Sequence, residues 1–174
     1  MGSYLLVAFA VAAAEPSIAD LDWMIGDWTF EDRATEAAGF KYEERGTRSC
    51  RWAMRHQYIR CESQGGTTAR PRTYVNYFNY NPAEKRFEMV SMWSNHPPKD
   101  IRAGQATPGR REVVLRQLRP ERDDDGIVKQ SWAVLKFDGD ATWTWESGSR
   151  MDGSQEDGPV RFRDVAVRRT APAR

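Results

Sequence analysis

Two histidines, His56 and His96, are the first candidates for acid–base catalysis or metal binding. Catalysis by a nucleophile requires that residue, a base beside it and a group that orients the base. His56 falls in a predicted turn and His96 in a proline-rich stretch, so neither has a partner at a catalytic spacing. We therefore expect no catalytic residue. An enzyme acting on a lipid or aromatic substrate through His96 is the least favoured function.

The acidic side chains that cluster in the sequence do not have the spacing of a catalytic carboxylate pair or of a calcium-binding loop. Glu43 and Glu44 are adjacent, so on a strand they face opposite ways and cannot act on one substrate. The aspartates within 123–125 and 152–157 lack the alternating ligands and the final glutamate of a calcium loop. The sequence therefore predicts no metal site and no cofactor.

Cys50 and Cys61 are the two cysteines of the chain. If Arg55 and His56 form a two-residue turn between antiparallel strands, the cysteines are directly opposed and can form a disulfide. A shift of one residue would instead place them on opposite faces, as two small buried thiols. Both alternatives stay open from the sequence, whereas the spacing makes a poor zinc site.

The size and charge of the chain limit its class. It has 174 residues, of which 40% are hydrophobic, which is enough for one domain with a filled core and short for two. Its 26 basic and 25 acidic side chains nearly cancel. A net charge of +1 provides no field that would attract nucleic acid or an anionic membrane. We therefore expect no nucleic-acid partner.

Residues 1–14, MGSYLLVAFAVAAA, contain an apolar run of the length found in secretory signal peptides and end in Ala-x-Ala. We expect cleavage after Ala14, a single domain over residues 15–174, and a periplasmic or secreted protein. The run is too short to cross a bilayer, so we expect no membrane segment in the mature chain. Export to an oxidising compartment would favour the disulfide.

Apolar and polar side chains alternate between turn signals, which is typical of antiparallel strands. We expect an all-β protein whose eight or nine strands form an up-and-down barrel or a sandwich. Residues 95–109 contain three prolines and two glycines and are predicted to be a loop or a broken edge strand. The alternation breaks in the last strand, which indicates a β-bulge near Arg163 and Asp164. The expected strands span 27–33, 40–54, 57–64, 73–80, 86–94, 111–118, 127–137, 141–147 and 160–169.

The stretch LDWMIGDW, residues 21–28, places a short apolar turn before a Gly-x-Trp motif at the head of the first strand. With the later turn YNPAEKRF and a following tryptophan, it resembles the lipocalin and calycin superfamily, and within it secreted bacterial lipocalin-like domains. The resemblance implies a single antiparallel up-and-down β-barrel of about 8–10 strands with a short N-terminal helical plug. It also implies structural roles for Gly26 and Trp28, with an arginine of the last strand stacked on the indole. The candidate arginines are Arg161, Arg163 and Arg168.

The nitrobindin branch of this superfamily binds haem through a histidine late in the barrel. His96 is the last histidine of this chain, so the resemblance does not carry over that haem ligand.

The interior of such a barrel is either filled by side chains or lines a cavity for one small molecule. We expect non-catalytic binding or carriage of a small hydrophobic ligand, with Tyr77, Asn76 or Arg48 meeting a polar head group. Two alternatives stay open: a filled interior, or an interaction or structural domain of the cell envelope. The candidate ligand-binding residues are Trp52, Ile59, Tyr77, Phe78, Met89, Trp93, Trp132, Trp143 and Trp145.

Overall fold

The structure is a computed structural model that describes residues 15–122, 126–139, 141–151 and 153–169. The predicted signal peptide lies outside the described residues. Two short 3-10 helices and eleven strands make up the described chain. Their bounds are η1 Ile18–Met24, β1 Gly26–Ala34, η2 Glu36–Ala38, β2 Glu43–Ala53, β3 Tyr58–Thr67, β4 Arg70–Asn81, β5 Arg86–Trp93, β6 His96–Ala106, β7 Glu112–Gln117, β8 Glu121–Arg122, β9 Val128–Gly139, β10 Thr142–Met151 and β11 Val160–Arg168.

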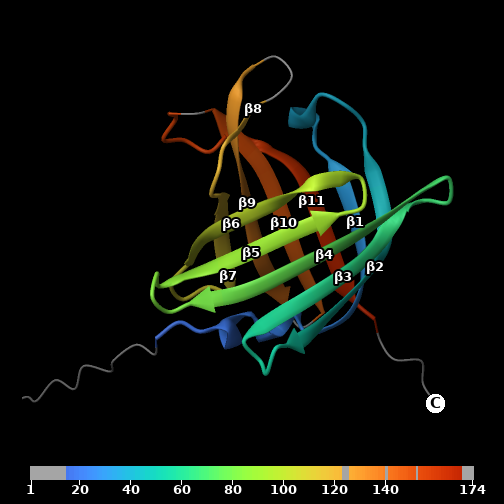
Figure 1. Cartoon of the computed structure of the whole chain (residues 1–174). Coiled ribbons are helices and arrows are strands. Elements are labelled where there is room, and N and C mark those ends of the chain that lie inside the picture. Colours follow the sequence, from blue (N-terminus) through green and yellow to red (C-terminus); the bar gives the residue numbers. More distant parts are fainter. Residues whose placement is uncertain (1–14, 123–125, 140, 152, 170–174) are drawn as a thin grey trace, which may run out of the picture.

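Ten of the strands close into an antiparallel barrel. Their order is β10-β11-β1-β2-β3-β4-β5-β6-β7-β9, and β9 pairs back with β10. The short strand β8 extends the sheet beside β9. Consecutive strands are neighbours from β1 to β7, and β11 returns to the side of β1 (Figure 1). The predicted all-β up-and-down barrel is confirmed.

Strand β6 corrects the prediction that residues 95–109 form a loop or a broken edge strand. It pairs with β5 on one side and β7 on the other. The register of the β5–β6 pair shifts between Ser91 and Trp93, next to the two consecutive prolines of β6. Proline lacks an amide donor, and such residues are tolerated where a ladder is irregular. The composition favoured a loop because it does not reveal where the prolines fall in the ladder.

The predicted bulge near Arg163 and Asp164 is also wrong, because β11 pairs with β1 without interruption there. The register shift lies nearer the start of β11, where it pairs with the Ser147–Gly148 step of β10. Asp164 is buried, whereas Val165 and Val167 lie on the outer face and are more exposed. Inward and outward side chains therefore alternate without a break from Asp164 onward. The charged Asp164 takes an inward position, and Val165 and Val167 take outward ones.

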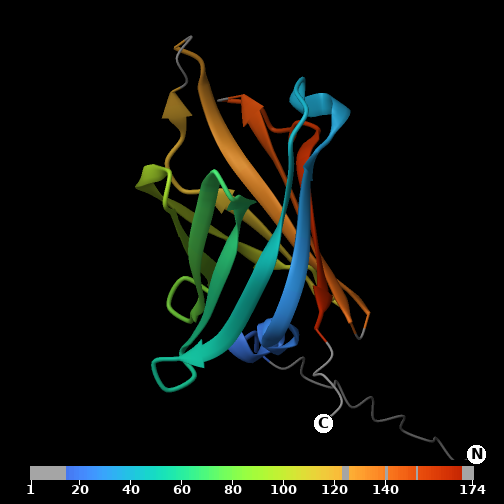
Figure 2. The ribbon, with the colours of Figure 1, turned by 90° about the vertical axis from the view of Figure 1, so that its right-hand side faces the viewer.

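Helix η1 closes one end of the barrel, at the bottom of Figure 2. Ser17 and Asp20 form a capping box that satisfies backbone amides at its start. Leu21, Trp23 and Met24 are buried beneath the strands. The apolar turn before the Gly-x-Trp motif therefore forms the N-terminal plug predicted from the sequence.

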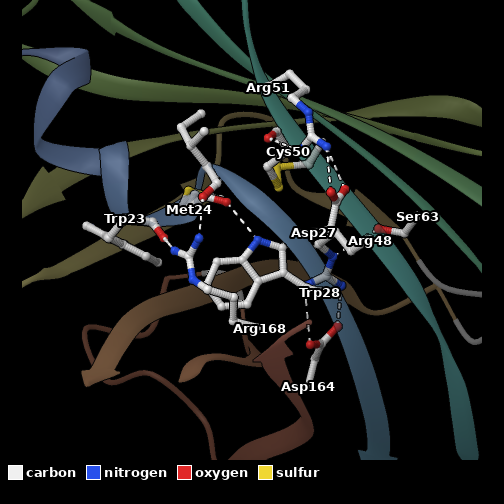
Figure 3. The surroundings of a disulfide bond; sticks show 12 residues. Trp23, Met24, Asp27, Trp28, Arg48, Cys50, Arg51, Ser63, Asp164 and Arg168 are labelled. Carbon is white, nitrogen blue, oxygen red and sulfur yellow. Dashed lines mark hydrogen bonds and ion pairs between the residues drawn. A yellow bond between two sulfur atoms is a disulfide. The ribbon is translucent and has the colours of Figure 1, made fainter. Parts of the chain in front are cut away.

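Trp28 joins the plug to the barrel. The indole Nε1 donates a hydrogen bond to the Met24 carbonyl at 2.9 Å. The guanidinium of Arg168 lies 4.4 Å from the centre of the Trp28 ring, and its Nη1 donates to the Ile25 carbonyl at 3.1 Å (Figure 3). Because β1 and β11 pair Trp28 with Arg168, this arginine is the one that stacks on the indole.

Arg161 and Arg163, the other two candidates, do not occupy this position. Nη2 of Arg161 donates to the Ala38 carbonyl at 3.2 Å, beside η2. Nε of Arg163 donates to the Glu146 carboxylate at 2.8 Å on the outer face of the sheet. The pairing of β11 with β1 sets both residues toward the opposite end of the barrel from Trp28.

Cys50 and Cys61 are joined by a disulfide that links β2 to β3. Figure 3 shows Cys50 close to Trp28, the residue that joins the plug to the barrel. The two residues are directly opposed, in the register expected from a turn centred on Arg55 and His56. Both turn residues have positive φ, and a hydrogen bond of 3.2 Å closes the turn. These are the features of a type I′ hairpin, which suits the twist of antiparallel strands.

Loss of this disulfide is expected to destabilise the fold. In the variant Cys50→Ala/Cys61→Ala, the free energy of unfolding should fall by about 3 kcal/mol, because the bridge no longer restricts the unfolded chain. Urea denaturation of the oxidised protein and the variant measures the difference. Wild type unfolded under reducing conditions should approach the variant, since alanine leaves only a small void. Equal stability of oxidised protein and variant would contradict the expectation.

The half of the barrel next to η1 is filled by apolar side chains. Trp143 makes edge-to-face contacts with Trp23 and Trp28, with ring centres 5.9 and 6.2 Å away. The disulfide and the buried side chains of Phe78 and Met89 belong to the same cluster. A filled interior is therefore found in this half of the molecule.

Candidate ligand-binding site

The other half of the barrel contains a cavity of about 570 Å³. Inward side chains of β1, β2, β4, β5, β6, β10 and β11 line it. Phe40 and Tyr42, which follow η2, also contribute. Figure 2 shows η1 and η2 at opposite ends of the barrel, so the cavity lies toward the end away from the plug.

Arg48 forms the floor of the cavity. Its side chain is only 6% exposed; Nε donates to the Ser63 hydroxyl at 2.9 Å, while Nη1 and Nη2 bind the two carboxylate oxygens of Asp164 (Figure 3). The guanidinium carbon lies 4.8 Å from the centre of the Phe30 ring and 4.7 Å from that of Trp143. This ion pair, held between two rings, separates the apolar core from the cavity.

Three carboxyl groups lie side by side on one wall. Asp32 of β1 is paired directly with Glu44 of β2 and with Asp164 of β11. Directly opposed residues have Cβ atoms about 5 Å apart, so the three side chains interact. Burial raises the pKa of Asp164, although Arg48 acts in the opposite direction. The wall therefore concentrates three acidic groups next to two arginines, Arg48 and Arg72.

Oε2 of Glu44 is held by its neighbours, whereas Oε1 is buried without a partner among the described residues. The Tyr74 hydroxyl donates to its Oε2 at 2.7 Å, the Tyr42 hydroxyl donates to the same atom, and Arg72 Nη1 lies 3.5 Å away. Burial and these hydrogen bonds raise the pKa of both tyrosines, so their hydroxyls remain donors. A Cβ at Gly65 would lie 2.2 Å from Glu44 Oε1, so glycine at this position leaves room for the carboxylate.

Asp32 lies in the middle of this row, and like Glu44 it has one carboxylate oxygen without a hydrogen-bond partner among the described residues. Its Oδ1 is buried and has no hydrogen-bond partner among the described residues. Burial, followed by the charges of Asp164 and Glu44, raises the pKa of Asp32 to about 7, while Arg48 opposes the shift. The group therefore changes its protonation state near neutral pH.

The wall opposite is also polar. In the ten-strand order, β6 lies diametrically across the barrel from β1. On β6, Asp100 Oδ2 accepts hydrogen bonds from Arg102 Nε at 2.7 Å and Nη2 at 2.6 Å. Asp100 Oδ1 and Arg102 Nη1 have no partner among the described residues. Beside them, the Ser91 hydroxyl donates to the amide oxygen of Asn76.

Aromatic rings complete the lining toward the open end. Trp93 and His96 stack with their ring centres 4.5 Å apart. Phe162 packs against Phe40 at 5.9 Å and Tyr42 at 6.0 Å. The cavity thus combines flat apolar surfaces with polar atoms, which is the combination that orients a small molecule.

The structure divides the nine predicted ligand-binding residues between different places. Trp93 and Trp145 line the cavity, as do Asn76 and Arg48, which were expected to meet a head group. Trp145 also touches Phe78 of the core, with ring centres 6.5 Å apart. Five of the nine instead belong to the apolar core or pack against it: Trp52, Ile59, Phe78, Met89 and Trp143.

Tyr77 and Trp132 are placed away from the cavity, which corrects their predicted role. Tyr77 lies on the outer face, where the Arg60 guanidinium is 5.9 Å from its ring. Trp132 alternates with the core residue Ala133, and its ring covers Gly148 of the neighbouring strand. For Trp132, aromatic character favoured an inward position, but the alternation of its own strand directs it outward.

Arg48 was expected to meet a head group, whereas the carboxyl groups of the cavity were missed, although the sequence contains a signal for them. Glu44 and Arg48 share the parity of Cys50 on the same strand and therefore lie on the same face as this core residue. The nine candidate ligand-binding residues are instead all aromatic, aliphatic or methionine side chains. Charged residues in phase with apolar ones would have indicated a polar interior.

Among the described residues, no group of three or more histidine, cysteine, aspartate or glutamate side chains is arranged to hold a metal ion. His56 lies in the β2–β3 turn, with its ring 5.2 Å from that of Trp52. In the part of the chain that the structure describes, no helix has the length and apolar character needed to span a membrane.

Comparison with known proteins identifies the architecture. No protein-family model and no curated protein matches the sequence. Among solved structures, the chain is similar to the S-type phycobiliprotein lyase CPES from Guillardia theta, with a TM-score of 0.55 and 11% sequence identity, covering 90% of this chain and 95% of that chain. Similarity at this identity concerns the fold and not the activity. The chain is thus a ten-stranded antiparallel barrel with the lipocalin-like fold.

Proposed function

We propose that this protein binds and carries one small molecule with an aromatic body and polar groups, in the half of the barrel away from η1. The observation that carries the proposal is the cavity of about 570 Å³, whose lining combines aromatic rings with buried polar atoms. Its volume is typical of sites for single small ligands, which occupy roughly 300–1,000 Å³. The other half of the barrel is filled by side chains, so the cavity is a specific feature of this half and not a result of loose packing throughout the barrel.

The composition of the lining changes the expected chemistry of the ligand. The sequence favoured a small hydrophobic molecule with at most a polar head group, because tryptophan and methionine were expected to form most of the walls. Met89 instead belongs to the core, and Asp32, Arg48 and Asp100 line the cavity. A fully apolar ligand would leave Oδ1 of Asp32 and Oδ1 of Asp100 buried without hydrogen bonds, which is unfavourable. An amphipathic ligand satisfies them.

The location of the protein is proposed as periplasmic or extracellular. The disulfide between Cys50 and Cys61 supports this proposal, because such bonds persist in oxidising compartments and are rare in the cytosol. A carrier in such a compartment would bind its ligand without altering it chemically.

Filling the cavity tests the proposal. Ser147 of β10 lines the cavity, so Ser147→Trp should occupy the space and weaken binding of naphthylmethanol by about tenfold or more. Thr144→Trp on the same strand is the control, because its side chain bonds to Asp138 on the outer face. Isothermal titration calorimetry measures the affinity, and native mass spectrometry of protein isolated without denaturation reports any ligand already carried. Equal binding by both variants, or none by the wild type with any probe, would overturn the proposal.

A further inference from the structure

The charges that line the cavity do not balance. Four acidic side chains and three arginines contribute to it. Each arginine is already paired with an acid: Arg48 with Asp164, Arg72 with Glu44, and Arg102 with Asp100. Asp32 is the acid that remains, and no ion pair joins it to another described residue. When ionised, it gives the cavity a negative charge that no arginine there neutralises.

The free hydrogen-bonding atoms show the same imbalance. Oδ1 of Asp32 and Oε1 of Glu44 on one wall, and Oδ1 of Asp100 on the opposite wall, are buried acceptors without a partner among the described residues. The Asp100 side chain is only 5% exposed, so its vacant acceptor is well removed from solvent. Nη1 of Arg102 is the one matching donor on a cavity-lining residue. A ligand that completes these bonds must therefore bring more donors than acceptors.

From this imbalance, and resting on the proposed function, we propose that the ligand is an aromatic molecule with a protonated amine and that Asp32 is the residue that binds this nitrogen. A protonated amine supplies hydrogen-bond donors for the unpartnered acceptors and a positive charge that neutralises Asp32. Its aromatic body would pack against the aromatic part of the lining, which includes Trp93 and Trp145, and the faces of such rings attract a nearby cation.

An anionic ligand is disfavoured by the same geometry. Arg48, the cation nearest the carboxyl row, binds Asp164 and Ser63 and lies between two aromatic rings. Releasing it for a ligand anion would leave Asp164 buried without its counter-ion. An anion would also face the charge of Asp32 itself. Cation recognition requires no such rearrangement.

The neighbours of Asp32 make amine binding dependent on pH. Glu44 and Arg48 face it from β2 and Asp164 from β11, with Asp100 and Arg102 across the cavity. The pKa of Asp32, raised to about 7 by burial and the adjacent acids, means that the group is protonated at pH 5 and ionised at pH 8. The affinity for an amine should therefore rise over this interval, whereas that for a neutral analogue should not.

Three probes with one aromatic body separate the alternatives: naphthylmethylamine, naphthylmethanol and naphthylacetate. Calorimetric titration at pH 8 should show the amine binding about tenfold or more tightly than the alcohol, and the acetate most weakly. Asp32→Asn should remove the preference for the amine while retaining binding of the alcohol. Asp27→Asn is the matched control, since Asp27 lies on the same strand but pairs with Arg51 on the outer face.

The outcomes distinguish this inference from the proposed function. Binding of alcohol or acetate with equal or greater affinity than the amine would overturn amine recognition and leave the binding cavity intact. An amine preference that survives Asp32→Asn would overturn the role of Asp32. Absence of binding by all three probes would overturn the proposed function as well.

Discussion

Replacing Arg48 by methionine is expected to lower the free energy of unfolding by about 3–5 kcal/mol, because Asp164 then remains buried without its counter-ion. The hydrogen bonds from Arg48 to Asp164 and Ser63 are lost together, whereas methionine still fills the space between Phe30 and Trp143. Urea denaturation followed by tryptophan fluorescence measures the loss.

A second substitution shows whether the unpaired charge is the cause. In Arg48→Met/Asp164→Leu, no buried charge remains, so most of the lost stability should return. A double variant as unstable as the single one would contradict this account and assign the effect to packing. Recovery of stability in the double variant would show that the pair serves the cavity as a polar floor more than it serves stability.

The second large effect has the opposite sign. Asp32→Asn is expected to stabilise the protein by about 2–4 kcal/mol at pH 8, because the folded state no longer holds an ionised carboxylate there. Burial and the adjacent acids raise the pKa of Asp32 to about 7 in the folded protein from 3.8. The folded state therefore retains a proton that the unfolded chain releases, and wild-type stability falls as pH rises from about 4 to about 7.

Urea denaturation of both proteins at pH 5 and pH 8 measures this difference. The advantage of Asp32→Asn should be larger at pH 8, and constant above the folded-state pKa. Asp27→Asn should instead slightly lower the free energy of unfolding at both pH values. Arg51 lowers the pKa of Asp27, so the ionised carboxylate stabilises the folded state, and the variant loses this exposed ion pair. An advantage that does not change with pH would show that the charge of Asp32 is not its source. A more stable variant that has lost amine binding would also exclude misfolding as the reason for that loss.

The fold was more predictable than the site for a physical reason. Alternation reports which face of a strand is buried, and Trp28 with its plug marks the first strand, so the barrel follows from local patterns. The position of β6 did not follow, because the place of its prolines in the ladder depends on pairing with β5. Arg168 could be chosen over Arg161 and Arg163 only once the register of β11 with β1 was known.

The carboxyl row of the cavity could not be predicted from alternation alone, because alternation shows which face of a strand is inward but not which distant strands become neighbours. Asp32, Glu44 and Asp164 come from strands at both ends of the chain and meet only when the barrel closes. Their isolated positions resemble ordinary solvated charges in the sequence. Pairing between distant strands creates the site.

The seam between β1 and β11 has a consequence for how the chain folds. It joins the first strand of the barrel to the last, so the barrel closes only after nearly the whole described chain is available. Contacts between residues so distant in sequence slow folding, since the loop entropy is lost before the contacts form. Until β11 arrives, β1 and β10 each have an unpaired edge, and unpaired edges promote association with other chains. Newly synthesised chains should therefore depend most on chaperones just before β11 pairs with β1 and β10.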